Sequence, residues 1–143
     1  MNVIYARAEI PTTEKAIFLA GPTPRGGDLH GGWRKAAIEY LAYYAGNVLC
    51  PIPKDGVWDY QAQYDWEAFG LKASTVILFW VPRSLSLPAF TTNIEWGKWY
   101  SSGKCVLGYP TGTEKMRYFD LDAAVAGVPV FHVITGTTLD PRW

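Results

Sequence analysis

Five short apolar runs, separated by segments with helical periodicity, constrain the fold of this chain more than any other feature. The runs are Ala16–Ala20, Asn47–Cys50, Val76–Val81, Cys105–Gly108 and Val128–Ile134. Continuous apolar runs of this length are typical of strands that are buried on both faces. Because strands alternate with helical segments through short Gly/Pro turns, the sequence predicts an α/β fold. Its mainly parallel sheet of about five strands would be covered by helices on both faces.

The segments between these runs place apolar residues at helical spacing. We predict helices at Trp33–Gly46 (with Gly46 as the C-cap), Tyr64–Lys72, Ile94–Ser101 and Thr113–Val125. Met1–Lys15 is expected to form a loose lead-in or an edge strand, and Lys54–Gln63 an irregular segment. A length of 143 residues suits one domain, which we place at residues 1–143.

Charge and cysteine usage exclude several classes of function. Thirteen basic and thirteen acidic residues give no net charge, which argues against the binding of polymeric nucleic acid. Cys50 and Cys105 lack metal-ligand spacing and indicate buried, reduced thiols in a cytoplasmic protein. His30 and His132 lie far apart without other ligand types nearby, so we expect neither a metal site nor a catalytic histidine. The charged N-terminus does not resemble a signal peptide, and no apolar run is long enough to span a membrane.

The candidate polar residues follow the predicted strands. In a parallel α/β sheet, ligands bind beyond the carboxyl ends of the strands, where the strand order switches. The loops Gly21–Gly32 and Pro82–Asn93, and the segment after Cys105–Gly108, should meet at this edge. With the neighbouring helices they bring together Arg25, Asp65, Glu67, Asn93 and Glu95. Carboxylates, aromatic rings and a glycine-rich turn suit a small planar or sugar-bearing ligand.

Each of these features also has a purely structural interpretation. Glu95 could serve only to stabilise the N-terminus of its helix through the macrodipole. The Gly21–Gly32 segment has neither Gly-x-Gly-x-x-Gly nor the Gly-Lys-Ser/Thr of a P-loop, so it could be a flexible turn with Arg25 as a solvated charge. Asp65 and Glu67 are two residues apart and cannot face the same way on one helix, so one of them should point to solvent.

The order of several motifs resembles the nucleoside 2-deoxyribosyltransferase-like family. The matching segments, which span roughly Ala16 to Pro110, are Ile17-Phe-Leu-Ala-Gly-Pro-Thr-Pro24, Trp33-Arg34, Gln63-Tyr-Asp-Trp-Glu67, Val76-Ile-Leu-Phe-Trp-Val-Pro-Arg83 and Phe90-Thr-Thr-Asn-Ile-Glu-Trp-Gly97. Members of that family have a flavodoxin-like fold, a three-layer α/β sandwich, and cleave the N-glycosidic bond of a (deoxy)nucleoside or nucleotide. They pass the sugar to another base or to water, chemistry that requires no metal or cofactor.

The resemblance implies roles for individual residues. Glu95, in Glu95-Trp96-Gly97, would attack the anomeric carbon and form a covalent glycosyl ester. Glu67, with Asp65 as the second choice, would protonate or hydrogen-bond the leaving base, which requires a raised pKa. The other implied substrate contacts are Ala20, Gly21 and Pro22 in the pocket floor, Phe18 or Trp80 stacked on the base, and Thr91, Thr92 and Asn93 at the sugar hydroxyls or a 5′-phosphate.

The resemblance leaves substrate and acceptor open. Arg25-Gly26-Gly27 is similar to the Arg-Gly-Gly of deoxynucleoside 5′-monophosphate N-glycosidases and favours a phosphorylated substrate. Many relatives carry Ala-Asp where this chain has Ala73-Ser74, and Asp140 is the candidate for the residue that a neighbouring subunit supplies in relatives. That sharing, with seven Trp and nine Tyr, predicts a homo-oligomer. A non-catalytic nucleotide-binding or sensing module on the same fold is the alternative.

Overall fold

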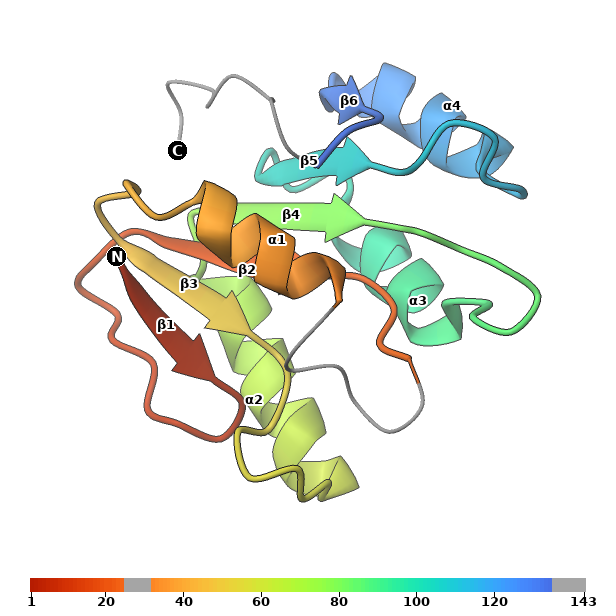
Figure 1. The fold of residues 1–143 in the computed structure, drawn as a ribbon. Helices are drawn as coiled ribbons and strands as arrows, with labels where there is room; N and C mark the ends of the chain where they lie inside the picture. Colours follow the sequence, from red (N-terminus) through yellow and green to blue (C-terminus); the bar gives the residue numbers. More distant parts are fainter. Residues whose placement is uncertain (25–31, 135–143) are drawn as a thin grey trace.

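The computed structural model describes residues 1–24 and 32–134, and these form one open, fully parallel sheet with helices on both faces (Figure 1). The strands are β1 (Asn2–Tyr5), β2 (Ala16–Ala20), β3 (Asn47–Cys50), β4 (Val76–Trp80), β5 (Cys105–Gly108) and β6 (Val130–Phe131). The helices are α1 (Trp33–Tyr40), α2 (Tyr60–Ala73), α3 (Phe90–Trp99) and α4 (Arg117–Ala126). The α/β fold predicted from the sequence is confirmed, with six strands in the described part of the chain rather than about five.

The order of the strands indicates where this sheet is expected to bind a ligand. Neighbouring strands follow the order β1-β3-β2-β4-β5-β6, and every pair is parallel. From β2 onward this is the flavodoxin-like order 2-1-3-4-5, and β1 adds an edge strand beside β3. The order reverses between β2 and β4, where Ala20 pairs with Phe79. The crevice of such a sheet is therefore expected beyond the carboxyl ends of β2 and β4.

The two faces of the sheet have separate cores. Alternate residues of a strand point to opposite faces, so strands covered on both faces must be apolar throughout. On one face, Ile17 and Leu19 pack with Ala37 and Leu41 from α1 and its C-terminal turn. The other face packs against α2, α3 and α4, through Phe18, Ile77, Phe79, Trp66, Trp96 and Phe119. Figure 1 accordingly shows α1 crossing in front of the strands and α2 passing behind them.

Several helices begin or end at residues other than those predicted. α2 begins at Tyr60 rather than Tyr64 because Asp59 caps it, accepting a hydrogen bond from the Ala62 N–H at 2.9 Å. α1 ends at Tyr40 rather than Gly46, α4 begins at Arg117 rather than Thr113, and the last strand shortens to Val130–Phe131. Among the described helices none is long and apolar enough to cross a membrane.

The start of α3 bears directly on the candidate site. The helix begins at Phe90 rather than Ile94, because Ala89 takes a left-handed conformation (φ 61°, ψ 44°) and turns the chain into the helix. A non-glycine residue in this conformation is strained and is held there by its surroundings. Glu95 therefore lies in the second turn of α3, not in the first turn as the sequence suggested.

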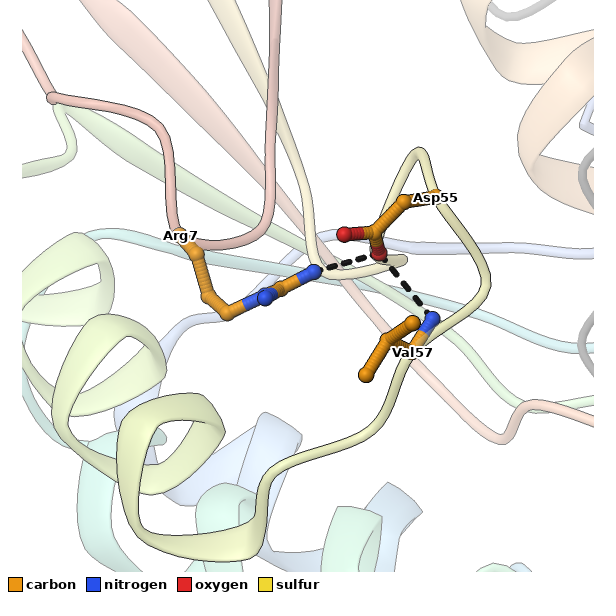
Figure 2. Close-up of polar contacts among 3 residues, drawn as sticks. All are labelled: Arg7, Asp55 and Val57. Atoms are coloured by element: carbon orange, nitrogen blue, oxygen red, sulfur yellow. Dashed lines mark hydrogen bonds and ion pairs between the residues drawn. The ribbon is translucent and has the colours of Figure 1, made fainter.

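An exposed contact orients the segment between β3 and α2. Arg7, which follows β1, donates to Asp55 Oδ1, and the same oxygen accepts the Val57 N–H at 3.0 Å (Figure 2). Two hydrogen bonds hold the pKa of Asp55 below its usual range: the one from the Val57 N–H has the larger effect, and the one from Arg7 the smaller. An ion pair in water adds little stability, so its effect is mainly to position this loop and the following Trp58.

Candidate active site

A cavity of about 750 Å³ lies beyond the carboxyl end of β2 and beside the segment that follows β4. Its floor consists of Phe18 and residues 20–24. One wall comes from the β3–α2 loop and α2, through Pro51, Trp58, Tyr60, Gln63, Tyr64 and Glu67. The opposite wall consists of residues 86–92 and Glu95, and Arg34 of α1 completes the lining. This volume is within the range of small-molecule sites, about 300–1,000 Å³.

The floor of the cavity is packed tightly against the sheet at Gly21. A Cβ atom at this position would lie 2.2 Å from the Trp80 carbonyl oxygen and 2.7 Å from the Trp33 ring. Trp33, the first residue of α1, also donates its Nε1–H to the Pro22 carbonyl oxygen at 3.1 Å. The turn after β2 is thus fixed between the end of β4 and the start of α1.

Arg34 is a buried cation that ties the same turn to α1. It is 4% exposed and donates to the carbonyl oxygens of Leu19 and Gly21 at 3.3 and 2.7 Å, and to Thr23 Oγ1 at 2.9 Å. Its guanidinium carbon lies 4.4 Å from the centroid of the Trp33 ring, a cation–π distance. Burial lowers the pKa of Arg34, yet a guanidinium stays charged in proteins. The cavity floor therefore carries a fixed positive charge.

The sequence of α3 turns Glu95 toward the cavity. Thr92 and Trp96 face inward and are almost fully buried. Trp96 packs edge-on against Phe79 with 5.2 Å between ring centroids, and its Nε1–H donates to Asp122 at 3.1 Å. These contacts fix the rotation of the helix about its axis. Glu95, three residues after Thr92 and directly before Trp96, therefore lies at the edge of the buried face, where it lines the cavity.

α2 separates its two acids in the same way. Gln63 and Trp66 are buried on the inner face of the helix. Glu67 follows Gln63 by four residues and lines the cavity, half-buried. Asp65 is exposed, accepts a hydrogen bond from Gln61 at 3.0 Å and does not line the cavity. Of the two acids that the sequence left as alternatives, the structure brings Glu67 to Glu95.

Burial opposes the ionisation of both carboxylates, and the charge of Glu67 also opposes that of Glu95. The pKa of Glu95 is raised to about 8, first by burial and then by the negative charge of Glu67, while Arg34 and Lys98 act in the opposite direction. Burial also raises the pKa of Glu67, against a hydrogen bond from Gln63 and the charge of Arg34. The pair therefore titrates as a coupled unit. A capping role at the helix N-terminus would instead lower the pKa of Glu95.

The structure gathers most of the residues that sequence analysis proposed for the site. Those that line the cavity are Phe18, Ala20, Gly21, Pro22, Glu67, Thr91, Thr92 and Glu95. Arg25, His30 and Asp140 lie outside the described residues.

Two other proposed residues are engaged elsewhere. Trp80 does not line the cavity and stacks on Phe131 of β6, with 5.7 Å between ring centroids. Asn93 is also absent from the lining, and its Oδ1 accepts a hydrogen bond from Arg83. Their positions in the sequence were compatible with the site, but each side chain has a partner outside the cavity: Phe131 of β6 for Trp80, and Arg83 of the β4–α3 segment for Asn93.

Sequence analysis missed Arg34, Gln63 and the aromatic residues Trp58 and Tyr64. A signal for Arg34 existed, because it stands three residues before Ala37 on the apolar side of its helix, where a charge requires buried partners. Gln63 precedes Glu67 by one helical turn, which also could have been noticed. Trp58 stands in the irregular Lys54–Gln63 segment, where no periodicity marks which side chains face inward. Tyr64 was predicted as the first residue of the helix, which in fact begins four residues earlier at Tyr60.

The described residues contain no group of three or more His, Cys, Asp or Glu side chains that could hold a metal ion. Cys50 and Cys105 are buried and form no disulfide. The Nδ1 atom of His132 lies 3.0 Å from the Tyr109 carbonyl oxygen, a hydrogen bond to the backbone.

A comparison with known proteins connects the cavity to a family. The model of the family described as "Nucleoside 2-deoxyribosyltransferase like" matches residues 14–113, which include β2 to β5 and every residue that lines the cavity. No curated protein matches the chain at a significant level. The family implies small nucleoside substrates. Because the match covers well over half of the sequence, the chain belongs to the nucleoside 2-deoxyribosyltransferase-like family.

Proposed function

We propose that this protein cleaves the N-glycosidic bond of a (deoxy)nucleoside or nucleoside 5′-monophosphate and passes the sugar to another base or to water. The observation that carries the proposal is the pair of Glu67 and Glu95. These carboxylates come from different helices, share one cavity and both have raised pKa values. Two carboxyl groups in different protonation states are the usual machinery for cleaving glycosidic bonds.

Glu95 acts as the nucleophile in this proposal. Its carboxylate oxygen attacks C1′ as the C1′–N bond breaks, through an oxocarbenium-like transition state, and forms a covalent glycosyl ester. The acceptor base or water then attacks C1′ from the opposite face and releases Glu95. Two successive inversions retain the configuration at the anomeric carbon.

The raised pKa values give the pair a proton to use. The nucleophile must be ionised and the departing base needs a proton, so the productive state carries the proton on Glu67 and the charge on Glu95. The charge of Glu67 is one cause of the raised pKa of Glu95, so the empty cavity holds this proton on Glu95 and the bound substrate has to shift it. Burial and mutual repulsion favour one charge on the pair rather than two. A ring nitrogen of the base that accepts a hydrogen bond from Glu67 selects the productive arrangement of that proton.

The lining of the cavity suits a nucleoside. A volume of about 750 Å³ accommodates a base together with its sugar. Trp58 and Tyr64 in the α2 wall, and Phe18 in the floor, offer aromatic surface for stacking on the base. Thr91 and Thr92 place hydroxyl groups in the first turn of α3, close to the nucleophile in sequence, for the sugar hydroxyls or a 5′-phosphate.

A non-catalytic nucleotide-binding module remains the alternative within this fold, and the carboxylate pair argues against it. Among the described lining residues the one cation is Arg34, which donates to the cavity floor. A glycosyl-transfer site requires two acids with raised pKa values, whereas a site that only binds a nucleotide does not require them.

Incubation with a 2-fluoro-2-deoxy nucleoside is expected to leave a covalent sugar on Glu95. The electron-withdrawing fluorine destabilises the oxocarbenium-like transition state through which the ester is hydrolysed. The ester then breaks down more slowly than it forms, so the adduct accumulates. Intact-mass measurement and peptide mapping locate the adduct, and chromatography of natural deoxynucleosides and their monophosphates detects free base. Asp65→Asn, on the outer face of α2, should form the same adduct. Base release with the sugar trapped at another residue would contradict the assigned nucleophile.

We also propose that the protein is a homo-oligomer, because large apolar side chains are exposed on and next to both walls of the cavity. Tyr60, Leu85, Phe90 and Ile94 are 94%, 97%, 73% and 60% exposed, and a second copy would remove such a surface from water. Light scattering at micromolar concentration should give at least the mass of a dimer. Ile94→Glu should reduce this mass to that of a monomer, while Val125→Glu on α4 should not. A monomeric wild type would contradict the proposal.

A further inference from the structure

Gln63 is a buried amide that joins the cavity wall to Glu67. It is 8% exposed, lies in the first turns of α2 and lines the cavity. Its Nε2 donates two hydrogen bonds, one to the Pro51 carbonyl oxygen at 2.8 Å and one to Glu67 Oε1 at 2.7 Å. Both N–H groups of the amide are therefore committed to fixed acceptors.

The carbonyl group of Pro51 determines which way this amide points. A carbonyl oxygen accepts hydrogen bonds but cannot donate them, so the nitrogen of Gln63 must face Pro51, and its second N–H then reaches Glu67. The amide oxygen of Gln63 is left buried without a hydrogen-bond partner among the described residues. A buried acceptor without a partner lowers stability, so the arrangement serves the contact with Glu67 at the expense of the fold.

The bond from Gln63 makes the two carboxyl oxygens of Glu67 unequal. Oε1 accepts the amide N–H, and the unprotonated oxygen of a carboxylic acid is the better acceptor, so the proton belongs on Oε2. No side chain in the described part of the chain bonds to Oε2. We infer that Gln63 is a positioning residue that keeps the transferable proton of Glu67 on Oε2, the oxygen left for the substrate. This inference rests on the proposed function.

The proton then has a defined path through the reaction. In the first step the Glu95 carboxylate forms a C1′–O bond, and the electron pair of the breaking C1′–N bond passes to the base. The proton on Glu67 Oε2 moves to the base nitrogen, so the base leaves neutral and Glu67 becomes a carboxylate that the Gln63 N–H stabilises. In the second step the incoming water or base attacks C1′, the ester bond to Glu95 breaks, and the attacking group returns a proton to Glu67.

The chain supplies a matched control on the opposite face of the same helix. Gln61 donates to Asp65 with the same four-residue spacing, at 3.0 Å, but this pair is exposed. Gln63→Leu should lower kcat for natural 2′-deoxynucleosides by about 100-fold, the lower range of general acid catalysis, with KM nearly unchanged. Gln61→Leu should stay within about twofold of the wild type, since surface substitutions of this kind have small effects. Gln63→Met gives a second test, and circular dichroism checks that each variant is folded.

N7-methyl-2′-deoxyguanosine separates proton delivery from general damage to the site. Its base carries a positive charge and departs neutral without a proton from the protein. A positioning residue for the proton should therefore be dispensable with this substrate, and Gln63→Leu should cleave it within about fivefold of the wild-type rate. Equal losses on this substrate and on natural deoxynucleosides would overturn the inference.

A titration of ¹³C-labelled glutamate carboxyl groups by NMR tests the contact without any activity. Because the bond from Gln63 favours the charged form of Glu67, Gln63→Leu should raise the pKa of Glu67, and Gln61→Leu should not. An unchanged Glu67 titration in Gln63→Leu would overturn the inference. A wild type that releases no base from any of these substrates would contradict the proposed function, and the titration alone would then decide whether Gln63 governs the protonation of Glu67.

Discussion

Replacement of Glu95 by Gln is expected to lower base release by about 10⁴-fold or more, because an amide cannot form the glycosyl ester on which turnover depends. The substitution nearly conserves the shape of the side chain. Thr92 and Trp96, which are buried and set the rotation of α3, are untouched, so the cavity should keep its form. Chromatographic assay of free base gives the rate, and full activity in Glu95→Gln would refute the assigned nucleophile.

Two comparisons distinguish loss of the nucleophile from general damage. Asp65→Asn removes an exposed acid from the outer face of α2 and should retain the wild-type rate. Glu67→Gln should lose activity on natural nucleosides, yet it should still form the covalent adduct with a substrate whose base departs without a proton. Glu95→Gln should form no adduct with either kind of substrate. If Glu67→Gln and Glu95→Gln behave alike with all substrates, the two acids do not have the separate roles proposed.

The same Glu95→Gln variant should be more stable than the wild type in alkaline solution. The folded-state pKa of Glu95 is about 8, against 4.5 for a glutamate side chain in water, so between these pH values the folded protein keeps a proton that the unfolded chain has lost. The free energy of unfolding of the wild type therefore falls as the pH rises through this range. Gln carries no such proton, and at pH 9 the variant should gain about 3 kcal/mol, with little difference near pH 4. Urea unfolding at both pH values measures this gain.

The sheet could be predicted from the sequence because strands buried on both faces need apolar residues at every position. The runs at β2, β3 and β5 coincide with the strands observed. Helix boundaries were less predictable, since each depends on the conformation or the capping bond of a single residue. Asp59 begins α2 by capping it, and Ala89 begins α3 through a left-handed conformation that its residue type does not favour. These two events moved the site residues to different turns of their helices.

The site was predictable where the ends of neighbouring strands bring residues together. It was less predictable where the rotation of a helix about its axis decides which side chains face the cavity. The spacing of Asp65 and Glu67 showed that one must face outward, but the burial of Gln63, one helical turn before Glu67, decides which. Trp80 stacks on Phe131, which is far away in the sequence, and Asn93 bonds to Arg83, ten residues before it. Such partners become visible once the fold brings β6 and the segment after β4 beside them.

Gly21→Ala is expected to destabilise the fold by about 3 kcal/mol and to abolish binding of nucleosides. The added Cβ would lie 2.2 Å from the Trp80 carbonyl oxygen, a backbone atom at the end of β4 that cannot rotate away. The clash can be removed only if the turn after β2 moves away from the sheet. That movement breaks the bonds by which Trp33 and Arg34 hold the cavity floor. Urea unfolding gives the loss of stability, and calorimetric titration with deoxynucleosides gives the loss of binding.

Gly97→Ala is the matched control because it introduces the same methyl group next to the proposed nucleophile. Gly97 lies within α3, and a Cβ there would meet no atom within 4 Å among the described residues. Alanine favours the helix over glycine, so this variant should gain about 0.5–1 kcal/mol of stability and keep its activity. If both substitutions cost the same, the close approach at Gly21 is not what holds the floor. If Gly21→Ala unfolds more easily while Gly97→Ala is stabilised, the geometry of the cavity depends on the close approach of Gly21 to the Trp80 carbonyl oxygen at the end of β4.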